Sequence, residues 1–111
     1  MSELAERKCQ ACNKNTPKLT RETIDALLRE APEWHERGER LHRQFRLQSF
    51  PTAIRFVDEM GRIAEAEQHH PVFTVNLDRV DVEIWSHAIG GLSENDFILA
   101  AKLDRAAKEL V

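Results

Sequence analysis

The sequence predicts an α+β fold with the element order α-β-β-α-β-β-α, in which a four-stranded antiparallel sheet carries three helices on one face. Three stretches repeat apolar residues at helical spacing, and four shorter stretches alternate apolar and polar residues as half-buried strands do. The alternating stretches form two neighbouring pairs, each close enough in sequence to form a hairpin. Hairpins separated by helices are typical of a sheet that helices cover on one face.

The 111 residues fit one domain with a modest core. Residues 1–18 show little apolar periodicity, so we expect a loosely packed N-terminal arm, followed by a folded domain over residues 19–111. No apolar run approaches the roughly 20 residues that cross a bilayer. Acidic residues stand near the start, where a signal peptide has basic ones, so we expect a cytoplasmic protein without a membrane partner.

Charge and cysteine content restrict the partners of the chain only loosely. Sixteen basic and nineteen acidic residues give a formal net charge of -3, and the basic residues are scattered, which makes nucleic acid a poor candidate partner. Cys9 and Cys12 form a Cys-x-x-Cys motif, a spacing shared by redox pairs and half zinc sites. No second ligand pair follows at finger-like spacing. A tail without chemistry, a metal ligand pair and a redox pair all stay open.

The first helix and the first hairpin have clear boundaries. Thr20 can cap a helix that carries one apolar stripe and stops at Pro32. Residues 34–37 and 41–47 then alternate on either side of Gly38, which predicts a hairpin with one buried face.

The second helix leads to the residues on which the function depends. Ser49 offers an N-cap, and Pro51 falls in the first turn, where a missing N–H does no harm. An apolar face then recurs at helical spacing. Because a proline disfavours the helical conformation of the residue before it, Pro71 is expected to close the helix at the histidine pair that precedes it.

A second hairpin and a third helix complete the fold. Residues 73–77 and 80–84 alternate apolar and polar side chains around a short turn. Ser93, with Asp96 three residues later, resembles a capping box with a shorter acid and predicts the start of the last helix.

Three of the five histidines gather near the end of the second helix. Glu65 lies four residues before His69, so on a continuing helix the two side chains share a face and can form a hydrogen bond. His70 follows directly, and His87 ends the last strand-like run. Histidine is the side chain whose unperturbed pKa lies near neutrality, so this gathering suggests proton transfer or metal ligation.

The spacing alone leaves three interpretations of this histidine cluster open. The pair at the helix end can be structural or solvated. The imidazoles can hold zinc with an open coordination position, or they can act as general acid and base. The sequence pattern itself names no substrate.

Several separated motifs keep the spacing of a known family. They are Glu65, His69-His70-Pro71, Trp85-Ser86-His87, and Gly90-Gly91-Leu92-Ser93-Glu94-Asn95-Asp96-Phe97 with Leu99-Ala100-Ala101. From about Leu19 to the C-terminus, the chain closely resembles the pterin-4a-carbinolamine dehydratases. The Cys-x-x-Cys motif in the arm is similar to one in bacterial members.

This resemblance implies a dehydratase that converts a 4a-hydroxytetrahydrobiopterin-type carbinolamine to quinonoid dihydropterin, in the recycling of pterin cofactors. The reaction delivers a proton to the leaving hydroxyl and removes one from a ring nitrogen, so two groups with near-neutral pKa suffice without a metal or an organic cofactor. By similarity, His69 and His87 are the acid-base pair, His70 binds and orients the pterin, and Glu65 supports His69.

Three further side chains are expected to contact the pterin. Gln68 stands where many relatives have Asp or Asn, and Phe73 lies near the third strand, where an aromatic residue of many relatives is absent. Trp85 can stack on the flat pterin, or pack on the sheet or against another subunit.

The resemblance also implies partners. Family members form homodimers or homotetramers, and edge strands of a small sheet invite pairing with a second copy. An aromatic amino acid hydroxylase is the expected functional neighbour. The alternative is a protein-binding member of the fold without catalysis, such as a dimerisation partner of a transcription factor or an enzyme-assembly chaperone, although such relatives tend to lose histidines that this chain keeps.

Overall fold

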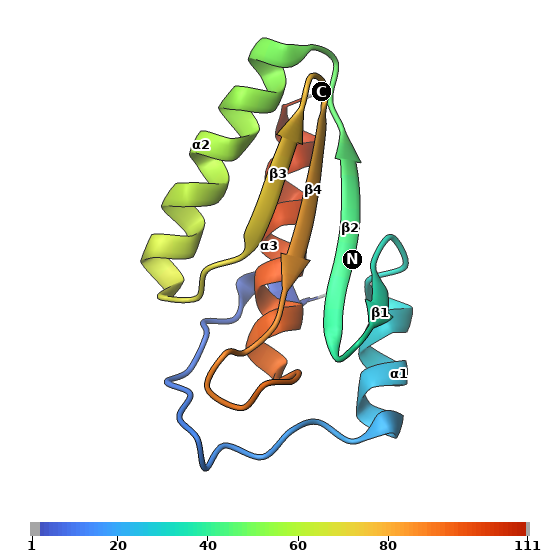
Figure 1. Ribbon diagram of the computed structural model, residues 1–111, viewed down its shortest axis with the longest axis vertical. Coiled ribbons are helices and arrows are strands. Elements are labelled where there is room, and N and C mark those ends of the chain that lie inside the picture. The colour runs from blue at the N-terminus through green and yellow to red at the C-terminus, as the bar shows by residue number, and fades with distance from the viewer. Residues whose placement is uncertain (1–2, 111) are drawn as a thin grey trace.

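The computed structural model describes residues 3–110, and it confirms the α+β fold and the predicted order of helices and strands (Figure 1). Residues 1, 2 and 111, which the predicted arm and domain include, lie outside the described residues. No helix over residues 3–110 is long and apolar enough to cross a membrane. The elements are η1 (Glu3–Glu6, a 3-10 turn), α1 (Arg21–Glu30), β1 (His35–Arg37), β2 (Arg40–Arg46), α2 (Phe50–Glu67), β3 (Val72–Asn76), β4 (Arg79–Ile84) and α3 (Glu94–Glu109).

The four strands form one antiparallel sheet in the order β1-β2-β4-β3, so β1 and β3 are its edges. Both hairpins turn through residues in the left-handed region: Gly38 and Glu39 each have φ 61°, and Leu77 has φ 57°. The two consecutive positive φ angles at Gly38 and Glu39 are typical of the tight turns that match the twist of hairpin strands. The antiparallel pairing of β1 with β2 and of β3 with β4 confirms both predicted hairpins.

The helices begin where the capping residues predicted. The hydroxyl oxygen of Thr20 accepts the Thr23 N–H at the start of α1, and that of Ser49 accepts the Thr52 N–H at the start of α2. At the start of α3, the Asp96 carboxylate accepts the Ser93 N–H at 2.8 Å. Side chains thus satisfy N–H groups that have no partner within the helix.

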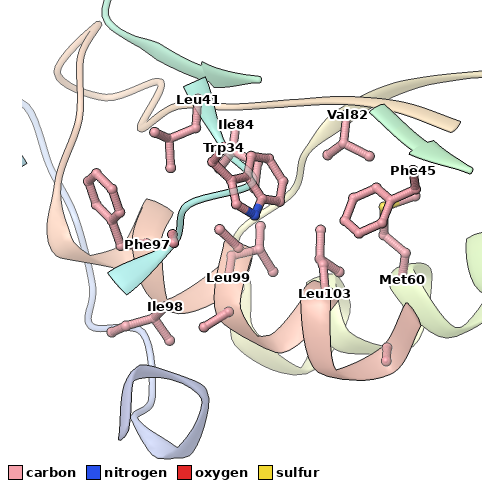
Figure 2. Packing of buried hydrophobic residues seen from close by; sticks show 14 of the residues in the cluster. Trp34, Leu41, Phe45, Met60, Val82, Ile84, Phe97, Ile98, Leu99 and Leu103 are labelled. Atoms are coloured by element: carbon pink, nitrogen blue, oxygen red, sulfur yellow. The ribbon is translucent and has the colours of Figure 1, made fainter. Parts of the chain in front are cut away.

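The core lies between the sheet and the helices (Figure 2). Sheet residues such as Leu41, Phe45 and Ile84 face α3, from which Leu99 and Leu103 point back toward them. Alternation along β2 and β4 puts these side chains on one face, as the period of two requires. The loop that follows β4 leads to the beginning of α3, and the candidate site lies there.

The N-terminal arm packs more tightly than its sequence predicts. Leu4 and Ala5 are buried in the core cluster, and η1 lies against α3. Lys102 and Arg105 of α3 both donate to the Ala5 carbonyl. A single turn shows no periodicity, which is why its burial was not predicted. The boundary of the domain at residue 19 stays a prediction.

Candidate active site

A cleft of about 610 Å³ opens where the end of α2 meets the loop after β4. Its volume falls within the range of small-molecule sites. All three histidines of the predicted cluster line it, and so does Gln68. The full lining is Cys9, Gln10, Ala11, Cys12, Ala66, Glu67, Gln68, His69, His70, Ser86, His87, Ala88 and Asn95.

Helix α2 ends before the histidine pair, and not at it as the position of Pro71 predicted. Glu67 is its last residue, and Gln68 adopts the left-handed conformation with φ 52° and ψ 41°. The His69 N–H then donates to the Ala64 carbonyl at 3.1 Å, which is the 6→1 bond of a Schellman motif. Gln68, and not Pro71, therefore turns the chain and separates the direction of His69 from that of Glu65.

His69 is bound to a buried carboxylate on another helix. Its Nε2 lies 2.6 Å from Oδ1 of Asp96, in the first turn of α3. The Asp96 side chain is completely buried and the His69 side chain nearly so. The predicted hydrogen bond between Glu65 and His69 is wrong, because the left-handed turn at Gln68 takes His69 off the helix face that Glu65 occupies.

The Asp96 carboxylate is held by more than the histidine. Its Oδ2 accepts the Ser93 N–H at 2.8 Å and the Ser86 hydroxyl at 2.9 Å. An ionised carboxylate accepts hydrogen bonds only, so an ionised Asp96 requires His69 Nε2 to be the donor. In its neutral form, His69 then carries its lone pair on Nδ1, the ring nitrogen left for a ligand.

His70, and not His69 as predicted, forms the hydrogen bond with Glu65. Its Nε2 lies 3.1 Å from Oε1 of Glu65, and both side chains are exposed. Gln68 also donates to Glu65, through Nε2 to Oε2 at 3.3 Å. The hydrogen bond from His70, followed by that from Gln68, lowers the pKa of Glu65 below its ordinary value. Glu65 lies at the rim of the site, outside the described lining of the cleft.

His87 lies in a turn and not at the end of a strand, because β4 already ends at Ile84. Its ring stacks on Trp85 with 4.2 Å between ring centroids and 21° between planes. The guanidinium of Arg40 also lies on the Trp85 ring, 3.8 Å from its centroid. Within residues 3–110, no hydrogen bond engages the His87 ring, so both its nitrogens are available to a ligand.

The structure leaves two predicted contact residues outside the cleft. Trp85 supports His87 by stacking and does not itself line the cavity. Phe73 is exposed on the edge strand β3 and is not among the residues that line the cleft. The sequence had indicated Asp96 only as a helix cap, and Ser86 only as part of a motif. Their role in holding His69 depends on contacts between elements, for which neither periodicity nor spacing gives a signal.

The cleft offers three imidazoles in three different settings: one backed by a buried carboxylate, one by an exposed carboxylate, and one stacked on an indole. No group of three or more His, Cys, Asp or Glu side chains within residues 3–110 is arranged to hold a metal ion. Imidazoles placed singly around a small cavity can donate and accept protons near neutral pH.

Curated relatives match the chain over nearly its whole length. Proteins named provisionally as pterin-4-alpha-carbinolamine dehydratases from Chlorobium luteolum and Rubrobacter xylanophilus are each 41% identical to it. The first match covers 99% of this chain and all of the relative, and the second covers 95% and 99%. A protein of the same provisional name from Nitrosospira multiformis is 38% identical over 94% of this chain and 92% of its own.

A solved structure agrees with these matches. The transcriptional coactivator/pterin dehydratase from Brucella melitensis superposes with a TM-score of 0.79 at 30% identity, covering 82% of this chain and 99% of its own. The family described as pterin 4 alpha carbinolamine dehydratase matches residues 17–106, which include every histidine of the cleft. The chain therefore belongs to the pterin 4 alpha carbinolamine dehydratase family.

Proposed function

We propose that this protein dehydrates a 4a-hydroxytetrahydrobiopterin-type carbinolamine to the quinonoid dihydropterin. The C4a–O bond breaks, the hydroxyl leaves as water after gaining a proton, and a ring nitrogen loses a proton. The reaction therefore needs one proton donor and one acceptor on the same pocket. The observation that carries the proposal is that His69, His70 and His87 all line one cleft of suitable size.

His69 and His87 are the proposed proton-transfer pair. The contact between His69 Nε2 and buried Asp96 fixes the ring and leaves Nδ1 for the substrate. Stacking on Trp85 orients His87 without occupying a ring nitrogen. Asp96 is a positioning residue, because it acts through His69.

His70 is proposed to bind and orient the pterin. Its side chain is exposed at the mouth of the cleft and is held by Glu65, which supports His70 in place of His69. Gln68 lines the cleft and can contact the same substrate. These residues are expected to affect substrate affinity more than the chemical step.

The test is dehydration of chemically generated 4a-carbinolamine, followed optically, with the wild-type protein and the variants His69→Ala and His87→Ala. Loss of a general acid or base typically reduces the rate by about 10²–10⁴-fold, and we expect kcat to fall within that range in both variants. His42→Ala is a matched control, because His42 pairs with Glu83 on the sheet and lies outside the cleft.

Two outcomes would overturn this assignment. If the wild-type protein does not accelerate dehydration, the dehydratase function is wrong. If activity follows a bound metal and disappears on chelation, the metal-free acid-base mechanism is wrong. Full activity after chelation, with no metal found by elemental analysis, supports the mechanism as proposed.

A homo-oligomer, either a dimer or a tetramer, is proposed as the working form. β3 is an edge strand whose free side can pair with another strand, and it exposes Val72 and Phe73. Leu77 in the adjoining turn is the most exposed of the large apolar side chains that the structure describes. A monomer at micromolar concentration by light scattering would contradict this proposal.

A protein-binding role is the second candidate, because the Brucella melitensis structure bears the name of a transcriptional coactivator as well as that of a dehydratase. The exposed apolar residues Phe50 and Ile54 on α2 offer a surface for such binding. A functional link to an aromatic amino acid hydroxylase and a cytoplasmic location remain predictions from the sequence. An active wild-type enzyme that loses activity with His69→Ala favours the dehydratase over a purely binding role.

A further inference from the structure

One wall of the histidine cleft comes from the N-terminal arm. Four consecutive residues, Cys9, Gln10, Ala11 and Cys12, line the same cavity as the three imidazoles. The stretch that matches the family begins only at residue 17. The cleft of this chain is therefore bounded in part by residues outside the matched stretch of the family.

The arm is fixed to the two helix ends that carry the histidine site. Asn95 forms a reciprocal pair with Gln10: the Gln10 N–H donates to Asn95 Oδ1 at 2.8 Å, and Asn95 Nδ2 donates to the Gln10 carbonyl at 2.7 Å. The Cys9 N–H donates to Glu67 Oε1 at 2.8 Å. Asn95 directly precedes Asp96, and Glu67 is the last residue of α2. The arm is therefore attached to the same two helix ends that position His69 and Asp96.

Charged side chains strengthen the attachment of the arm to α2 and α3. Burial by itself raises the pKa of Glu67, but the Cys9 N–H and the charge of Lys102 outweigh it and hold the pKa below its ordinary value. An ionised Glu67 is the better acceptor for the Cys9 N–H. Earlier in the arm, Arg7 forms ion pairs with Glu3 and with Glu94, at the start of α3.

The two cysteines differ in their surroundings. Cys9 packs against the core, and its Sγ lies 3.6 Å from the Asn95 carbonyl. Burial, and then the nearby Glu67 carboxylate, raises the pKa of Cys9 to about 12. Redox-active cysteines instead have lowered pKa values, so Cys9 has the surroundings of a packing residue that anchors the arm. Cys12 is half-buried on the cleft.

The part of the arm that lines the cleft also has backbone polar groups without a hydrogen-bond partner among the described residues. Within residues 3–110, the N–H and C=O groups of Ala11 and Cys12 have no hydrogen-bond partner, whereas both backbone groups of Gln10 are bonded to Asn95. Such groups are strong donors and acceptors that bond to water or to a ligand. The pyrimidine edge of a pterin presents donors and acceptors side by side, which is the pattern that adjacent backbone amides can match.

We propose that Gln10, Ala11 and Cys12 form a substrate-recognition wall, which binds the polar edge of a reduced pterin in the cleft that the three imidazoles also line, and determines affinity without taking part in proton transfer. This inference rests on the proposed dehydratase function. It predicts that damage to the wall raises KM and leaves kcat nearly unchanged, whereas loss of His69 lowers kcat.

The test compares Cys12→Trp with Lys14→Trp in the full chain. Both variants place the same bulk on the arm, but Lys14 is exposed and lies outside the cleft. We expect Cys12→Trp to raise KM by about tenfold or more, which corresponds to about 1.4 kcal/mol of binding. Lys14→Trp should keep the wild-type KM, and thermal unfolding should show that both variants are folded.

A second measurement uses the unmodified sequence. N-ethylmaleimide labelling at Cys12, located by peptide mass spectrometry, should slow in the presence of 7,8-dihydrobiopterin, because the bound pterin covers this residue. An arm that has only a structural role would not show protection by the ligand.

The two proposals can fail separately. If wild-type protein dehydrates the carbinolamine, but Cys12→Trp keeps its KM and dihydrobiopterin gives no protection, the recognition wall is wrong and the dehydratase stands. If wild-type protein neither accelerates dehydration nor shows protection, both proposals are wrong.

Discussion

Two adjacent histidines of this cleft each pair with a carboxylate, and the two pairs differ mainly in their contact with water. His69 lies 2.6 Å from Asp96, and the side chains are 11% and 0% exposed. His70 lies 3.1 Å from Glu65, and the side chains are 58% and 74% exposed. The residue types and the hydrogen-bonding atoms are comparable, so the main differences are the burial of Asp96 and its additional hydrogen bonds from Ser86 and Ser93.

Burial changes what a carboxylate can do for its histidine. Asp96 is fixed by Ser86 and Ser93 on its other oxygen and is shielded from salt, so it holds His69 in one orientation and favours one tautomer. Glu65 is exposed to solvent, and exposed pairs contribute little to stability. This difference is consistent with the roles proposed above, which are proton transfer for His69 and substrate contact for His70.

Among the variants that alter one of the two pairs, Asp96→Asn is expected to have the largest effect on catalysis. An amide cannot accept from the Ser93 N–H, the Ser86 hydroxyl and His69 Nε2 together, so one donor loses its partner or His69 changes tautomer. We expect kcat to fall by about 10²-fold or more, within the range of general acid-base catalysis. Steady-state kinetics on the carbinolamine measure it.

Glu65→Gln is the matched control, because it makes the same chemical change in the exposed pair. Its kcat should stay within about threefold of wild type, as expected when a solvent-screened partner is lost. Equal losses of kcat in the two variants would show that burial does not distinguish the pairs.

Much of the fold followed from local sequence signals. Thr20, Ser49 and Ser93 predicted the helix starts, and the alternation around Gly38 predicted a hairpin, because capping and strand period are short-range properties. The gathering of three histidines was also predicted, and the cleft confirms that they line one cavity. These features need no knowledge of how distant elements pack.

The partners of the histidines could not be predicted in the same way. The i,i+4 rule assigns Glu65 to His69 only if the helix continues, and the left-handed conformation of Gln68 ends it. Asp96 reaches His69 across 27 positions of sequence, through the packing of α3 against α2. The attachment of the arm at Asn95 depends on bonds between a side chain and a backbone, which no periodicity reveals.

A smaller effect is expected on folding stability. Because Asp96 is completely buried and accepts several hydrogen bonds, Asp96→Asn should lower the free energy of unfolding by about 2 kcal/mol, as for an unsatisfied buried group. Urea denaturation measures the change. Glu65→Gln should unfold at the wild-type urea midpoint; a shift as large as that of Asp96→Asn would contradict the assignment of these two pairs.

The turn that sends the two histidines to different partners can be tested at Gln68. A β-branched residue is strained at φ 52°, so Gln68→Val should lower the free energy of unfolding by about 1 kcal/mol, whereas Gln68→Asn should be nearly neutral. Thermal melts of both variants measure this. Equal melting temperatures would show that the left-handed conformation at this residue does not constrain the helix end.

The smallest expected effect is the contribution of the exposed pair, His70 and Glu65, to the pH dependence of folding stability. The pKa of Glu65 is lowered from 4.5, chiefly by the hydrogen bond from His70, so its ionised form is favoured in the folded protein. The resulting stability is present above pH 4.5 and is lost as the pH falls through the lowered pKa. The free energies of unfolding of wild type and Glu65→Gln should therefore differ slightly at neutral pH and converge in acid. In a His70→Ala background the difference should shrink, because the main cause of the lowered pKa is gone; an unchanged difference there would assign the effect to Gln68 instead.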